Sequence, residues 1–278
     1  MNNKCTVLIN SCDDYSDVWE LFFKALHVQW PTCEFPILLN TETKQYPNDY
    51  GVQVINYKPH YNDSWGARLK NALRNITTPY VIPILDDLVF KEKFTGDELI
   101  NKAVKWLDDN PDIGVFYLYK HPYLSQEKTE FEGFGLLPQK AEYKLTTAIG
   151  VWRREYFDKC VRGFETPWEW EVDVTRKAWK YKERMYALLE TQEEPYKYTF
   201  GGVVWRGLWH PEVKELAEKY DVKIDFSKRG FMDETDPYRI KNIYLIRKNF
   251  PKDICKLIFW REVCKRLKTR TRRFLCEI

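Results

Sequence analysis

Two adjacent carboxylates, Asp86 and Asp87, directly follow an apolar, β-branched run at residues 78–85. Such a run is typical of a strand that is buried on both faces of a sheet. Ligands of open α/β sheets bind outside the carboxyl ends of the strands. Two acids placed there repel each other and are costly to desolvate, and a divalent cation that bridges to a diphosphate would offset both costs. The pattern therefore indicates a site for Mg²⁺ or Mn²⁺ with Asp87 and Asp86 as ligands; a strand that ends in a polar turn is the alternative.

The segments around this pair alternate between strand and helix patterns, which predicts an α/β fold with parallel strands. The predicted strands occupy residues 6–14, 36–39, 52–55, 78–85, 113–119, 145–152 and 183–189. The predicted helices occupy residues 18–26, 65–74, 95–109, 153–160, 167–180 and 211–220. Ser16 or Asp17 is the predicted N-cap of the first helix, and Thr95 with Glu98 forms a predicted capping box. These elements must position the two acids.

Four segments, residues 11–19, 64–69, 85–88 and 166–171, resemble in their order and spacing the GT-A fold glycosyltransferases. They are most similar to the family 2-like bacterial enzymes that build capsular and other surface polysaccharides. The resemblance covers about residues 5–211. It implies a Rossmann-like, mostly parallel central sheet flanked by helices, in a domain of residues 1–250. The acidic motif of that family often separates its acids by one residue; here they are adjacent, which leaves open which acid touches a metal and whether one is needed.

The resemblance implies a nucleotide-sugar donor over the end of the first strand. Asp13 or Asp14 would accept hydrogen bonds from the base or ribose, and Asp86 would face the donor as well as the metal. Arg68 would bring a cation near the phosphates, and Trp65 would cover the base. A solvent-facing cation on an amphipathic helix is the alternative for Arg68, and a residue that merely begins the helix is the alternative for Trp65.

Transfer to an acceptor hydroxyl also needs a carboxylate that takes up the proton. By resemblance to the inverting family 2 enzymes, Glu169 is the predicted base and Glu171 the alternate, although the helix dipole alone also favours acids there. Trp168 and Trp170 are predicted to stack an acceptor sugar, with core packing as the alternative. His210 is the predicted third metal ligand; a histidine that caps a helix or packs beside its neighbours is the alternative.

The C-terminal segment 251–278 is predicted to be a basic amphipathic tail. Residues 252–278 contain nine Lys/Arg against three Asp/Glu, a net charge of +6, whereas the whole chain has +3. Basic amphipathic helices bind anionic membrane surfaces; a helix that packs on the domain is the alternative. Nucleic-acid binding is not expected, because the basic charge is confined to this end.

Other features narrow the function class. Seven cysteines without a Cys-x-x-Cys motif argue against a zinc knuckle and fit reduced thiols in the cytosol. No signal peptide and no membrane-spanning apolar run is expected. The sequence thus predicts a cytoplasmic, inverting glycosyltransferase, peripheral at the inner face of the membrane, that extends a lipid-linked surface glycan. A nucleotide-sugar nucleotidyltransferase and a non-catalytic glycan-binding protein on the same fold are the rivals; the first would need a Gly-rich N-terminal loop with a basic residue.

Overall fold

A computed structural model describes residues 4–47, 50–57 and 64–232 of the 278-residue chain. The strands are β1 (Cys5–Asn10), β2 (Ile37–Thr41), β3 (Val52–Asn56), β4 (Tyr80–Leu85), β5 (Ile113–Tyr117), β6 (Phe134–Leu136), β7 (Gly150–Arg153), β8 (Arg184–Leu188), β9 (Val204–Trp205) and β10 (Leu208–Trp209). The helices are α1 (Trp19–Gln29), α2 (Trp65–Asn75), α3 (Asp97–Asp109), α4 (Arg154–Cys160), α5 (Pro167–Glu169), α6 (Thr175–Ala178) and α7 (Val213–Lys219). All of them lie in one compact unit, Met1–Arg229. The predicted tail, 251–278, lies outside the described residues.

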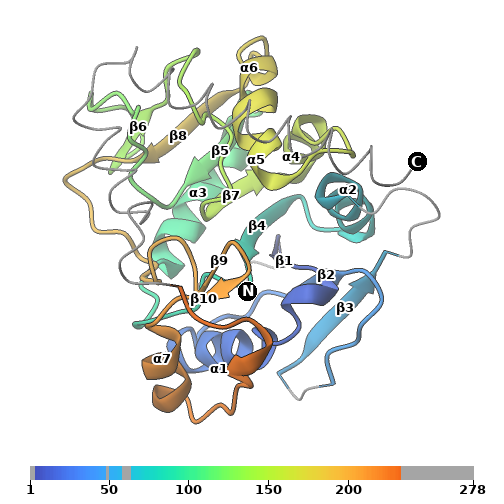
Figure 1. Cartoon of the computed structure of the whole chain (residues 1–278). Helices are drawn as coiled ribbons and strands as arrows, with labels where there is room; N and C mark the ends of the chain where they lie inside the picture. The colour runs from blue at the N-terminus through green and yellow to red at the C-terminus, as the bar shows by residue number, and fades with distance from the viewer. Residues whose placement is uncertain (1–3, 48–49, 58–63, 233–278) are drawn as a thin grey trace, which may run out of the picture. The chain divides into compact units, whose positions relative to one another are not determined.

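Eight strands form one sheet in the order β3-β2-β1-β4-β7-β5-β8-β6. Strands β3, β2, β1 and β4 run parallel, and β5 runs parallel to β8, whereas β7 and β6 run antiparallel to their neighbours. Every residue of β1 is buried, and so is nearly all of β4, as the apolar runs predict. The predicted fold class, an α/β protein with a mostly parallel central sheet flanked by helices, is confirmed (Figure 1).

Strand β4 changes its pairing along its length. It pairs with β1 over all six residues, but with the antiparallel β7 only at Tyr80 and Val81. Pro83, which has no backbone N–H to donate, lies just beyond that pairing. The last part of β4 therefore leads away from β7, and the residues that follow it stand at the carboxyl edge of the β1–β4 pair.

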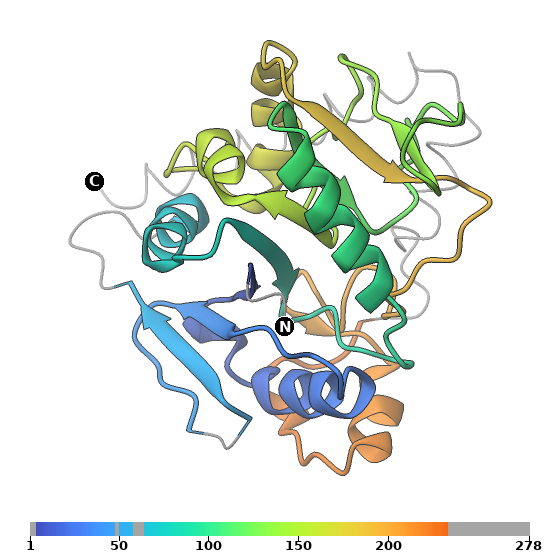
Figure 2. The same cartoon turned by 180° about the vertical axis from the view of Figure 1, so that it is seen from behind.

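The helices cover both faces of the sheet. Helices α2 and α4 pack together on one face, over a core that contains Leu8, Val81 and Trp152 (Figure 1). Helices α1 and α3 cover the other face (Figure 2), where Trp106 of α3 packs on Phe116 with ring centroids 5.3 Å apart. This two-sided cover explains why the central strands are continuous apolar runs.

The structure corrects two predicted helix caps. Helix α1 has Val18 as its N-cap, without a side-chain cap, so neither Ser16 nor Asp17 caps it. Helix α3 begins after Gly96 and likewise has no side-chain cap, so the capping box predicted at Thr95 does not form. The sequence patterns identified cap-forming residue types, but backbone turns displace the helix starts by one or two positions, so these side chains do not reach the first N–H groups.

Candidate active site

The acid pair, Asp86 and Asp87, lies where β4 ends, beside the end of β1. Asp86 is 3% exposed, and it accepts hydrogen bonds from the Ser11 hydroxyl and from Trp19 Nε1, the latter at 3.1 Å. The same indole nitrogen lies 2.7 Å from Ser11 Oγ. Asp86 thus ties β4 to the end of β1 and to the first residue of α1. The Asp87 carboxylate, in contrast, accepts no hydrogen bond from another residue in the described part of the chain.

Both acids resist ionisation in the absence of a cation. Burial raises the pKa of Asp86 to about 7, against opposing hydrogen bonds from Ser11 and Trp19. Burial and then the neighbouring charge of Asp86 raise the pKa of Asp87 well above its usual range. The only cation that acts on both in the described residues, Arg229, opposes these shifts weakly. A bound cation would remove much of this cost, because it favours both ionised forms.

A glycine lies directly against Asp87. Gly202 has φ +86°, and a Cβ built there would stand 2.5 Å from Asp87 Oδ2. The next backbone N–H, that of Val203, donates to the main-chain oxygen of Asp87 at 2.8 Å. The segment before β9 therefore packs on the acid pair, and it can approach so closely because residue 202 has no side chain.

Arg229 fixes the loop that follows β1. Its Nε and Nη2 form a fork on the Asp17 carboxylate at 2.8 and 2.7 Å, and Nη2 also donates to the main-chain oxygen of Asp14. The guanidinium lies over the rings of Tyr15 and Trp209, 4.7 and 5.3 Å from their centroids. Asp17, predicted as a helix cap, is thus the anchor of this arginine. Asp14 is exposed, and its side chain remains available to a ligand.

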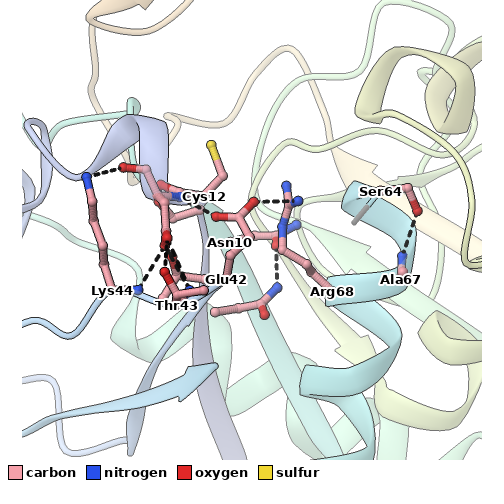
Figure 3. Close-up of polar contacts among 12 residues, drawn as sticks. Asn10, Cys12, Glu42, Thr43, Lys44, Ser64, Ala67 and Arg68 are labelled. Atoms are coloured by element: carbon pink, nitrogen blue, oxygen red, sulfur yellow. Dashed lines mark hydrogen bonds and ion pairs between the residues drawn. The ribbon is translucent and has the colours of Figure 1, made fainter. Parts of the chain in front are cut away.

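A second cluster lies beside the acid pair, at the ends of β1 and β2. Arg68 of α2 is 8% exposed, and its Nη1 lies 2.6 Å from Oε1 of Glu42, which follows β2 (Figure 3). Ser64 caps α2 by accepting a hydrogen bond from Ala67 N at 3.2 Å. Glu42 also accepts a hydrogen bond from the backbone N–H of Asp13. Burial raises the pKa of Glu42, and Asp13 N–H and Arg68 oppose that rise.

Cys12 lies near both clusters, because Asp86 of the first and Glu42 and Arg68 of the second act on its thiol. Burial raises the pKa of the Cys12 thiol to about 11, with further contributions from Asp86 and Glu42. Sequence reasoning missed Glu42. The rule that identified the acid pair, an acid at the carboxyl end of a parallel strand, could have found it.

Asp13 is engaged by its own chain. Its carboxylate accepts hydrogen bonds from Thr41 Oγ1 at 2.7 Å, from both the hydroxyl and the backbone N–H of Thr43, and from Lys44 N at 3.1 Å. Burial opposes its ionisation, but the bonds from Thr43 and Thr41 hold the pKa of Asp13 well below its usual range. The predicted donor-binding role is therefore reinterpreted: Asp13 orders the turn that carries Glu42.

The predicted aromatic residues divide between core and surface. Trp170 is 1% exposed, packs on Trp65 with centroids 5.6 Å apart, and donates to Cys160 O at 3.0 Å. Trp65 is 8% exposed and belongs to the same core. Both rings fill the space between helices, which corrects the predictions that Trp170 stacks an acceptor and that Trp65 covers a base. Trp168 is 63% exposed and remains open to a ligand.

The two candidate bases have different surroundings. Glu169 closes a capping box with Thr166: its Oε2 accepts from Thr166 N at 2.9 Å, and Glu169 N donates to Thr166 Oγ1 at 3.3 Å. Glu171 Oε1 accepts from Thr147 N, Thr147 Oγ1 and Thr146 Oγ1 at 2.7, 2.8 and 3.1 Å. Glu171 Oε2 makes no hydrogen bond to any described residue. Glu169 therefore has a structural role in the helix start, and Glu171 is a fixed carboxylate with one oxygen available.

His210 has a local role in the structure. Its Nδ1 lies 3.2 Å from Glu212 N, and its main-chain oxygen accepts from Val213 N, so it supports the turn before α7. The predicted helix start at Pro211 is two residues early, because α7 begins at Val213. Among residues 4–47, 50–57 and 64–232, no three His, Cys, Asp or Glu side chains are grouped as metal ligands. The predicted set of Asp86, Asp87 and His210 is therefore not assembled.

No protein-family model and no curated protein matches this chain. Several solved structures match it, and three of them are 12–14% identical to it. A cytidylyltransferase from Leptospira borgpetersenii serovar Hardjo-bovis is 12% identical, with 88% of this chain and 94% of that chain covered and a TM-score of 0.44. Residues 1–349 of S. aureus TarS are 13% identical (81% and 68% covered, TM-score 0.46). Mannosyltransferase PcManGT from Pyrobaculum calidifontis, in complex with GDP-Man and Mn²⁺, is 14% identical (94% and 80% covered, TM-score 0.46).

No helix in the described part of the chain has the length and apolar character that crossing a bilayer requires.

Proposed function

We propose that this protein is a glycosyltransferase that moves a sugar from a nucleotide diphosphate donor to a hydroxyl group, with inversion. The observation that carries the proposal is the acid pair at the end of β4, where the Asp87 carboxylate accepts no hydrogen bond from the described residues, while the carboxylates of Asp86, Asp17 and Glu42 each accept at least one. A carboxylate left in this state at the carboxyl edge of a parallel sheet is typical of a ligand site. The sequence motifs that resemble family 2-like enzymes of surface polysaccharide synthesis support the same activity.

The acid pair fits a divalent cation, although no third protein ligand is grouped with it among the described residues. Mg²⁺ commonly keeps several waters and is bound by one or two carboxylates together with substrate phosphates. Asp87, together with Asp86, would hold such an ion. When bound, the ion would neutralise charge on the departing diphosphate. The raised pKa of both acids agrees with this role, because a bound cation would favour their ionised forms.

The donor and acceptor would occupy opposite sides of the acid pair. On one side, the buried Glu42–Arg68 ion pair offers an acceptor oxygen and guanidinium N–H groups that could recognise a nucleobase or ribose. On the other side, we assign the base to Glu171 rather than to Glu169. Glu171 Oε2 would take the proton of the acceptor hydroxyl while the new bond to the sugar carbon forms, and the bond to the diphosphate would break to release a nucleoside diphosphate.

A panel of nucleotide sugars tests the proposal. Wild-type protein should be stabilised against thermal unfolding by at least one donor in the presence of Mn²⁺, and by about 2.7 kcal/mol when the ligand is at 100 times its dissociation constant. Asp87→Asn should keep the fold and lose both the Mn²⁺-dependent stabilisation and transfer, because it removes the charge but keeps the shape. Stabilisation of wild type by a nucleoside triphosphate, with pyrophosphate released when a sugar phosphate is added to accept the nucleotidyl group, would favour the nucleotidyltransferase. Full activity of Asp87→Asn would refute the metal role.

A further inference from the structure

Tyr198 lies within electrostatic reach of Asp87 and of Glu171, the carboxylate assigned as the base. The chain that leaves β4 pairs with the chain before β9, through an antiparallel bridge between Phe90 and Tyr198 and a hydrogen bond of 2.8 Å from Lys91 N to Lys197 O. This pairing brings Tyr198 next to the end of β4. Sequence reasoning gave Tyr198 no role, because its position depends on a contact between segments more than 100 residues apart in the chain.

Tyr196 and Tyr198 share one face of this extended segment but differ at their hydroxyl groups. Tyr196 is buried, its hydroxyl donates to Leu88 O, and its ring lies 4.3 Å from that of Phe90. Tyr198 packs on Tyr196 with centroids 5.0 Å apart. Its hydroxyl, however, makes no hydrogen bond to any residue in the described ranges, and its side chain is only partly buried. Tyr196 is therefore a packing residue, and Tyr198 presents a donor without a protein partner.

The charges around Tyr198 have one sign. Burial raises the pKa of Tyr198 to about 12, and Glu194, Asp87 and Glu171 add to this rise. No described cation acts on it. Glu194 is held in place because its Oε1 accepts a hydrogen bond from Lys120 N at 2.8 Å. The nearby Tyr119 hydroxyl also has its pKa raised, first by burial and then by Glu171, Tyr198 and Glu194.

We propose that the Tyr198 hydroxyl contacts the acceptor and donates a hydrogen bond to it, and that Tyr198, Glu171 and Glu194 form an acceptor subsite for a neutral or amine-bearing saccharide. An acceptor with a carboxylate or phosphate near the reacting hydroxyl would be repelled by Glu171 and Glu194, because the cation proposed at the acid pair does not offset the charges of these two. A tyrosine ring also offers an apolar face to a sugar ring and a polar group to its hydroxyls. This inference rests on the proposed glycosyltransferase function, whose donor side is tested separately by the stabilisation with nucleoside diphosphate and Mn²⁺.

The test compares Tyr198→Phe with Tyr196→Phe in the full chain. Acceptor binding is measured by saturation-transfer NMR with methyl glucoside, methyl galactoside, glucosamine and methyl glucuronide, in the presence of Mn²⁺ and UDP or GDP. We expect the neutral and amine-bearing sugars to bind wild type about tenfold more tightly than the uronide. Tyr198→Phe should weaken the binding of the neutral and amine-bearing sugars about fivefold, because it removes one neutral hydrogen bond. Tyr196→Phe should lower the melting temperature and leave the ratio between sugars unchanged.

Glu194→Gln provides a second variant, because it removes one negative charge without removing the tyrosine. It should improve binding of methyl glucuronide relative to methyl glucoside. Equal binding of the uronide and the neutral sugar in wild type, no effect of Tyr198→Phe, or no binding of any sugar in the panel would overturn the acceptor assignment. Stabilisation by nucleoside diphosphate and Mn²⁺ is recorded in the same samples. Its absence would refute the proposed function, whereas its presence with any of those sugar results refutes only this inference.

Discussion

Glu171→Gln should lower kcat by a factor of about 100 to 10,000, the range for the loss of a positioned base. Glu171 Oε1 accepts three hydrogen bonds from Thr146 and Thr147, and a glutamine carbonyl can keep all three. The substitution then removes only the negative charge of the Glu171 side chain that accepts these bonds, which should cost about 1–2 kcal/mol of folding free energy. Donor affinity should be unchanged, because Glu171 and the Glu42–Arg68 pair lie on opposite sides of the acid pair in our assignment.

Glu169→Gln is the matched control, because it lies two residues away and glutamine also satisfies a capping box. We expect its kcat within about twofold of wild type. Both variants are assayed by release of nucleoside diphosphate, with the donor that stabilises wild type best and saturating acceptor, and their melting temperatures are compared. A greatly lowered kcat of Glu169→Gln together with a normal kcat of Glu171→Gln would show that the base is Glu169. Normal activity of both would refute a mechanism that depends on a carboxylate in this segment.

Gly202→Ala should abolish Mn²⁺-dependent stabilisation, because it combines the cost of a positive φ, about 1–2 kcal/mol, with a contact of the added Cβ on Asp87. Gly207→Ala is the control: its φ is +83° and no atom lies within 4 Å of the added Cβ, so it should lower the melting temperature but keep the Mn²⁺-dependent stabilisation. In chelator, the melting temperature should fall as pH rises from 5 to 8, since Asp86 has a pKa of about 7 when folded and near 4 when unfolded, so its stabilising proton is lost through that window. Asp86→Asn should flatten this slope; an unchanged slope would refute the assignment. Truncation after Phe250 should keep donor binding but release the protein from anionic liposomes, with wild-type binding that weakens as salt rises; a truncated protein that aggregates would count against a membrane role.

The sequence predicted β4 and α2 to within two residues at each end, because burial on two faces, or on one helical stripe, leaves a local pattern; the strand predicted over residues 6–14, in contrast, ends at Asn10. It placed a strand over residues 145–152, whereas β7 begins at Gly150. The reason is that the backbone before it bonds elsewhere: Leu145 N donates to Thr175 Oγ1, and Thr147 N donates to Glu171. Apolar alternation cannot reveal that side chains from another segment take these N–H groups.

The candidate site was predicted only in part, because a local sequence pattern marks some of its residues and packing between distant segments places the others. The acid pair is visible because both acids follow their strand directly. Trp168 and Trp170 have similar sequence surroundings, but Trp168 is exposed and Trp170 is buried. Trp170 packs against Trp65 in the core, and the sequence pattern does not show this contact. Glu42 could have been found by the rule that identified the acid pair, whereas Tyr198 becomes recognisable only when the pairing of its segment with the chain after β4 is known.

Hydrogen bonds to their carboxylates distinguish the acids with a structural role from the acid that we assign to ligand binding. Asp86 is held by Ser11 and Trp19, and Asp17 is held by Arg229. Each of these carboxylates stabilises the contact between two segments. Asp87 receives no such bond within the described residues, although it lies beside another acid and against the backbone of Gly202. A fold gains nothing from a carboxylate in that position, because its desolvation and the repulsion from Asp86 are not offset. Asp87 is therefore the residue whose presence is best explained by a ligand, and a bound cation is the partner that would offset both costs.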